Sequence, residues 1–127
     1  MAIDRRMMLG GTAAMMALPG TVFAMEENHM FGMLGRVKAV AGKREALIAL
    51  LLEGSGMMPG CLSYIVAEDL SDPDAIWVTE AWDSKQSHAD SLKLSQVQAA
   101  IARARPLIAG FDSSAQTRPV GGIGLQS

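Results

Sequence analysis

The stretch AIWVTEAWDS, residues 75–84, decides the fold of this chain. Its side chains alternate between two faces of an extended backbone: Ile76, Val78, Glu80 and Trp82 on one, Trp77, Thr79 and Ala81 on the other. This period of two predicts a β-strand over Ala75–Trp82. The polar pair Asp83-Ser84 is typical of a helix N-cap, so we expect a helix to begin at Lys85.

Two more strands and a helix are predicted upstream of this stretch. Residues 31–40 and 61–67 both alternate with a period of two, so each predicts a strand. Between them, residues 43–53 carry Leu and Ile on one face of a helix. The glycine-rich segment 54–56 ends this helix, and the turn at 70–74, rich in Asp and Pro, leads into the third strand.

A second helical region and a fourth strand are predicted downstream. Ser95 is a candidate N-cap for a further helix that runs to Ala104. Pro106 and Gly110 are expected to close this region. Residues 114–120 alternate more weakly and predict the last strand.

The element order is therefore β-α-β-β-α-β, the split, ferredoxin-like arrangement of the α+β class. Its antiparallel sheet carries the helices on one face. The other face holds Trp77 and has to be buried against a second layer of structure. One chain of this length is too short to provide that layer. A second sheet from a second copy is the simplest cover, so we expect a homodimer with its sheets face to face, a dimeric α/β barrel.

The first 24 residues have the composition of an export signal. Arg5-Arg6 precedes an uncharged, largely apolar run, residues 7–24, that ends in Val22-Phe23-Ala24. We expect cleavage after Ala24, and the arginine pair resembles a twin-arginine signal. A membrane anchor is the alternative, but a span needs about 20 apolar residues, and this run is shorter and interrupted by glycines and a proline. The sequence thus predicts a signal peptide at 1–24 and one periplasmic domain at 25–127, without membrane contact.

Charge and cysteine content narrow the partners of the mature chain. Removal of Asp4, Arg5 and Arg6 with the signal takes the formal net charge from −2 to −3. A nucleic-acid partner would need a clustered basic face, so this class is excluded. Cys61 is the one cysteine, so it forms no internal disulfide. It is either buried or able to pair between chains, and burial is favoured because it opens an apolar run.

The strand end Thr79-Glu80-Ala81-Trp82-Asp83-Ser84, followed by a polar helix, resembles the antibiotic biosynthesis monooxygenase domain. The spacing from residues 36–42 through Pro59-Gly60-Cys61 to Glu80-x-Trp82 is similar, and the resemblance covers residues 31–120. It implies a dimeric ferredoxin-like protein. Several members of the family oxidise quinols, anthrones or related polyketide aromatics with O2 and without metal or flavin. Others degrade haem, and many have no established activity.

This sequence departs from the haem-degrading members. They carry an asparagine on the first strand and a histidine on the second helix, where this chain has Gly35 and Leu92. Only Trp82 of that set remains, so the resemblance does not support haem degradation. Many quinol-oxidising members place histidines in the second helical region. The nearest matches here are Ser91 and Gln96, and His88 lies one turn earlier.

Oxygenation without a cofactor needs a dry apolar pocket, a base, and a donor that stabilises an oxyanion. Trp82, Val78 and Leu51 are candidates to wall such a pocket between sheet and helices. His88 is the candidate base, because an imidazole titrates near working pH. The candidates for holding the oxyanion are Arg36 and Tyr64, with Glu80 on the same face as Trp82 as a further substrate contact.

Each candidate also has a structural explanation. Trp82 and Tyr64 are equally compatible with core packing, and His88 with a solvated helix face. Arg36 alternates outward with Lys38 and is compatible with a surface charge. Glu80, if buried, needs a partner such as Arg36.

The spacing of the histidines, the cysteine and the glycines suggests no other type of site. The two histidines and the cysteine are too far apart for a metal site, and no phosphate-binding glycine loop precedes a helix. The predicted function is therefore a monooxygenase without metal or other cofactor, acting with O2 on a small quinol-like or polyketide-like aromatic. The alternatives are a non-catalytic dimer that binds a small apolar ligand, and a structural dimer without a cavity. A cavity beside Trp82 that contains a polar side chain would favour the enzyme.

Overall fold

The computed structural model describes residues 29–125 and confirms the predicted α+β order. The predicted signal peptide, residues 1–24, lies outside the described residues. In chain order the elements are β1 (Phe31–Ala39), α2 (Arg44–Gly54), β2 (Cys61–Glu68), β3 (Ala75–Trp82), α3 (Lys85–Ser91), α4 (Ser95–Ala104), the 3-10 turn η2 (Arg105–Leu107) and β4 (Ile108–Thr117).

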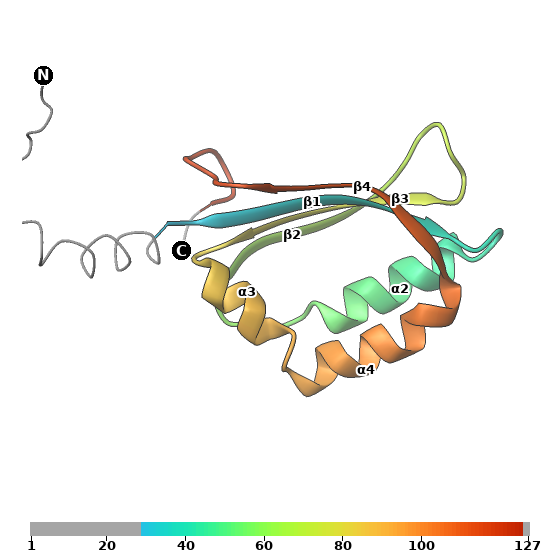
Figure 1. The fold of residues 1–127 in the computed structure, drawn as a ribbon, viewed down its shortest axis with the longest axis horizontal. Helices are drawn as coiled ribbons and strands as arrows, with labels where there is room; N and C mark the ends of the chain where they lie inside the picture. Colours follow the sequence, from blue (N-terminus) through green and yellow to red (C-terminus); the bar gives the residue numbers. More distant parts are fainter. Residues whose placement is uncertain (1–28, 126–127) are drawn as a thin grey trace, which may run out of the picture.

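The four strands form one open antiparallel sheet in the order β2-β3-β1-β4. This is the strand order of the ferredoxin-like arrangement, with the two strands that each precede a helix, β1 and β3, at the centre. Helices α2, α3 and α4 all lie on one face, and the opposite face is bare (Figure 1). Within the described residues, no helix is both long and apolar enough to span a bilayer.

The inner face of the sheet carries the alternating set that the sequence predicts. Phe31 pairs with Trp82 across β1 and β3, Val37 pairs with Ile76, and both pairs face the helices. Leu47 of α2, Ile76 and Trp82 are almost completely buried. Burying side chains of this size contributes about 1.5–3 kcal/mol each, so this layer anchors the helices on the sheet.

The structure confirms one of the two predicted helix caps and shifts the bounds of the last strand. Ser84 caps α3 as predicted: its Oγ accepts a hydrogen bond from the Ser87 backbone N–H at 3.0 Å. The predicted Ser95 cap is wrong, because Leu94 holds the cap position and Ser95 is already helical. Strand β4 begins at Ile108, six residues before the predicted start, because β-bulges in its pairing with β1 interrupt the period of two.

The contact between α2 and α4 depends on a glycine. Gly54, the last residue of α2, is buried, and a Cβ at this position would lie 2.6 Å from the Cβ of Ala100 on α4. Any larger residue must therefore push the two helices apart. Gly54 also lines the cavity described below, so the spacing of the helices and the shape of that cavity are coupled.

Replacing Gly54 by Ala is therefore expected to lower the free energy of unfolding by about 1–3 kcal/mol, the usual cost of overpacking. Gly56→Ala is the matched control, because a Cβ there meets nothing within 4 Å. Urea unfolding followed by circular dichroism measures both changes. Equal stabilities of the two variants would show that the helices separate at no cost.

Candidate functional site

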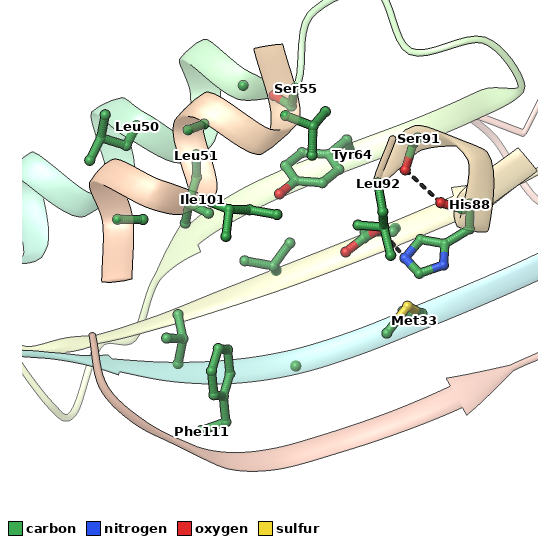
Figure 2. Close-up of a pocket in the computed structure, with 18 of the residues that line it drawn as sticks. Met33, Leu50, Leu51, Ser55, Tyr64, His88, Ser91, Leu92, Ile101 and Phe111 are labelled. Carbon is green, nitrogen blue, oxygen red and sulfur yellow. Dashed lines mark hydrogen bonds and ion pairs between the residues drawn. The ribbon is translucent and has the colours of Figure 1, made fainter. Parts of the chain in front are cut away.

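A cavity of about 460 Å³ lies between the inner face of the sheet and the helices. Most of its wall is apolar, from Met33, Leu50, Leu51, Val78, Ile101 and Phe111. Phe111 is 73% exposed although it lines the cavity, so the wall reaches solvent beside β4 (Figure 2). An apolar cavity of this size with few polar groups is typical of a site for a small organic molecule.

Polar side chains gather at the α3 side of the cavity. Glu80 of β3 lies directly across from Tyr64 of β2, so the two side chains share the inner face. His88 reaches the same place from α3, because that helix begins three residues after β3 ends. We call Tyr64, Glu80 and His88 the polar corner. Figure 2 shows Tyr64 and His88 projecting into the cavity from different elements.

Glu80 is the centre of the polar corner. Its Oε1 accepts a hydrogen bond of 2.9 Å from the indole Nε1 of Trp82 and lies 3.9 Å from His88 Nε2. The Glu80 side chain is 17% exposed and that of His88 is 20% exposed. A carboxylate so far removed from water needs partners, and the indole and the imidazole provide them. The pairing of Glu80 with Arg36 that the sequence suggested does not occur.

His88 is held in place from three sides. Its ring centroid lies 5.5 Å from that of Phe31 and 5.4 Å from that of Trp82, which it meets edge-on. The buried hydroxyl of Ser91 donates a hydrogen bond of 2.6 Å to the His88 carbonyl. The structure therefore places His88 against the sheet rather than on a solvated helix face. Ser84 caps α3 and so fixes the residue at which the helix begins. The starting residue determines which side chains of α3 face the sheet, and His88 is one of them.

Tyr64 presents a hydroxyl that makes no hydrogen bond to any residue in 29–125. Burial is the main cause of a pKa well above the usual value for this phenol, and the nearby Glu80 carboxylate raises the pKa further. The hydroxyl therefore keeps its proton at any working pH and serves as a hydrogen-bond donor.

Arg36 does not line this cavity, so the structure does not bring it together with the other predicted site residues. It lies on the opposite face of the sheet, where its guanidinium bonds to Asp69 at 3.1 Å and pairs with Asp112 and Asp72. The guanidinium is also 5.9 Å from the centre of the Trp77 ring. The alternation in the sequence predicted that Arg36 faces outward, but its three acidic partners come from the turn between β2 and β3 and from β4.

The remaining predicted residues meet in one place. Val78, Leu51 and Trp82 all line the cavity, and Trp82 is at the same time part of the core. Sequence reasoning missed Ser91, Phe31 and Met33 as parts of the site. The inward position of Phe31 and Met33 on the first strand was the available signal, and Ser91 stood in the sequence only as a near match to a histidine of quinol-oxidising members.

The single cysteine and the acidic residues form no second site. Cys61 is partly buried, and burial raises the pKa of its thiol. Within residues 29–125, no three His, Cys, Asp or Glu side chains gather so that they could hold a metal ion.

The sequence model of the antibiotic biosynthesis monooxygenase family matches residues 30–103. The chain belongs to this family. A crystal structure from Chloroflexus aurantiacus, described as a candidate antibiotic biosynthesis monooxygenase, is 58% identical. The similarity covers 76% of this chain and 99% of that one, with a TM-score of 0.75. None of the curated proteins matches this chain.

More distant structures share the fold of this antibiotic biosynthesis monooxygenase domain. A Caulobacter crescentus protein described in the same way is 19% identical over 80% of this chain and 99% of that one, with a TM-score of 0.68. A Bacteroides thetaiotaomicron protein of unknown function is 18% identical over 72% and 98% of the two chains, with a TM-score of 0.64. At these identities the likeness concerns the fold alone.

The Asp69 network on the outer face generates a prediction about acid stability. Trp77 Nε1 donates to the Asp69 carboxylate at 2.8 Å, the backbone N–H groups of Ser71 and Asp72 donate to it as well, and Arg36 is its ion-pair partner. These hydrogen bonds, of which the one from Trp77 contributes most, hold the pKa of Asp69 well below its usual range.

A lowered pKa means that the Asp69 carboxylate stabilises the fold above about pH 4, the pKa of an unfolded Asp, and that this contribution is lost as pH falls below it. Asp69→Asn is thus expected to lower the Tm at pH 7, with the gap to the wild type shrinking below about pH 4. Asp90→Asn, an exposed carboxylate on α3, is the control. A gap that stays constant down to about pH 3 would contradict this role of Asp69.

Proposed function

We propose that this protein is a cofactor-independent monooxygenase that oxidises a quinol-like or polyketide-like aromatic with O2 inside the cavity. The observation that carries the proposal is the polar corner in a largely apolar cavity beside Trp82. A cavity that only bound an apolar ligand would need no partly buried carboxylate and imidazole, and both are costly to remove from water.

In this proposal His88 is the general base. It removes a proton from a phenolic hydroxyl of the substrate, or from the CH2 carbon of an anthrone. The Glu80 carboxylate, 3.9 Å away, stabilises the imidazolium that forms. The Tyr64 hydroxyl donates a hydrogen bond to the oxyanion of the substrate. The apolar walls exclude water, which strengthens both interactions.

The electrons then come from the substrate and the oxidant is O2. The substrate anion passes one electron to O2, and the resulting radical pair combines to form a C–O bond. Cleavage of the O–O bond and loss of water leave one oxygen atom in the product. An anthrone CH2 carbon and O2 thus give a carbonyl and one water, and a hydroquinone and O2 give a hydroxyquinone and one water. Neither overall reaction needs a reductant other than the substrate itself.

We also propose that the protein works as an exported homodimer. On the outer face, Leu34 of β1 and Ile65 of β2 flank Thr79 in one row of the sheet and are 38% and 55% exposed. Strand β4 is exposed along most of its length. A second sheet packed against this face would cover the apolar row. Export to the periplasm rests on the signal-like residues 1–24.

The enzymatic proposal predicts O2 uptake with quinols and anthrones above their rate of autoxidation, in the presence of a chelator. His88→Gln is expected to lower the rate by about 10²–10⁴-fold, the usual contribution of a general base. His29→Gln is the matched control, because His29 is the other histidine and is exposed outside the cavity. An oxygen electrode measures the rates.

The controls separate the two candidate functions. Uptake that is unaffected by His88→Gln would remove His88 as the base. Binding of a quinone to the wild type without any uptake across the panel would favour the non-catalytic binding dimer, to which the largely apolar wall is also suited.

The dimer proposal makes a separate prediction. Ile65→Lys places a charge in the apolar row of the outer face, on the edge strand β2, and is expected to give a monomer in light scattering after gel filtration. Leu70→Lys is the control, because Leu70 lies fully exposed in the turn before β3. A wild type that is already monomeric, or an Ile65→Lys protein that stays dimeric, would rule out this face as the interface.

A further inference from the structure

We propose that Glu80 acts as a charge filter, so that the cavity admits uncharged aromatic ligands and rejects those that carry a carboxylate. The inference rests on the proposed function only in that the ligand is aromatic and occupies the cavity. It concerns which ligands bind, and is therefore separable from whether any ligand is oxidised.

Glu80 brings a negative charge to the wall of the cavity. Its carboxylate lines the cavity on the inner face, and the described chain offers it only the indole N–H of Trp82 and the imidazole of His88. A neutral indole does not compensate a negative charge. In an apolar surrounding that screens charges weakly, a second carboxylate in the same cavity would be repelled.

Positively charged side chains lie away from the polar corner. Arg36 and Lys38 lie behind the sheet and are paired with Asp69, Asp112 and Asp72. Of the described lysines and arginines, Arg105 alone lines the cavity, and it comes from η2. Figure 1 shows that this end of α4 lies at the opposite end of the molecule from α3. An anionic group next to His88 would therefore find no cation.

The polar corner offers a ligand one hydrogen-bond acceptor, Glu80, and one donor, Tyr64. Glu80 is an acceptor, and the Tyr64 hydroxyl across from it keeps its proton and is free to donate. A ligand hydroxyl satisfies both, because it donates to the carboxylate and accepts from the phenol. A carboxylate satisfies Tyr64 alone and leaves Glu80 opposed by a like charge. The polar corner thus matches a neutral phenol.

The test is binding measured by isothermal titration calorimetry without oxygen at pH 7. The probes are 2-naphthol, 2-naphthamide and 2-naphthoate, which share one ring system and carry at the same position a neutral hydroxyl, a neutral amide and a charged carboxylate. The wild type is expected to bind naphthol and naphthamide at least about tenfold more tightly than naphthoate, since one like charge nearby is typically worth a tenfold change or more. Glu80→Gln keeps the shape and is expected to reduce this preference about tenfold.

Glu45→Gln is the matched control, because Glu45 is an exposed carboxylate in the first turn of α2 and does not line the cavity. It is expected to keep the wild-type preference. Equal affinity of the wild type for naphthamide and naphthoate would overturn the inference without any variant, so the test holds even if the Glu80→Gln protein folds poorly. A preference that survives in a folded Glu80→Gln protein, or no binding of any probe to the wild type, would overturn it as well.

The two proposals fail in different ways. Selective binding of the neutral probes without O2 uptake would remove the oxygenase and leave the charge filter. O2 uptake with equal affinity for neutral and anionic probes would leave the oxygenase and remove the filter.

Discussion

The structure of the site depends on keeping the Glu80 carboxylate in a largely apolar cavity. Such a group needs hydrogen bonds, because an unpaired buried charge costs far more than it contributes. The period of two in β3 sets Glu80 and Trp82 on the same face, and the indole N–H reaches the carboxylate at 2.9 Å. Helix α3 follows β3 almost at once and brings His88 to the same oxygen. One strand and the helix after it thus build the chemical part of the cavity.

The sheet separates two kinds of polar interaction. On the inner face the few polar groups have free donor or acceptor capacity, as the Tyr64 hydroxyl shows. On the outer face the carboxylate of Asp69 is saturated by Trp77, Arg36 and backbone N–H groups. Arg44 adds bonds from its guanidinium to the carbonyls of Asp69, Asp72 and Ala75. The outer network therefore fixes the turn before β3, and so the register of the strand that carries Glu80.

Alternation in the sequence predicted all four strands, the face on which Glu80, Tyr64 and Val78 lie, and the helical face with Leu51. It placed the start of β4 six residues too late, because bulges in the pairing with β1 break the period. The cavity could be anticipated only as a space between apolar faces. The partner of a charged side chain depends on tertiary placement, so neither the pairing of Arg36 with three acidic residues nor the contact of His88 with Glu80 was visible in the sequence.

The uneven distribution of polarity along the cavity orients whatever binds there. Phe111 and Ile101 are exposed at the side where the wall reaches solvent, whereas Glu80 and His88 are mostly shielded from it. A flat aromatic molecule that enters past the apolar rim gains by burying its rings along the way. An edge that carries a neutral donor and acceptor, such as a hydroxyl, satisfies the polar corner, and that edge would then point toward α3. O2 is itself apolar and is compatible with the same walls. In the proposed reaction, the reactive end of the ligand would lie against His88, and its rings would close the path of water behind it.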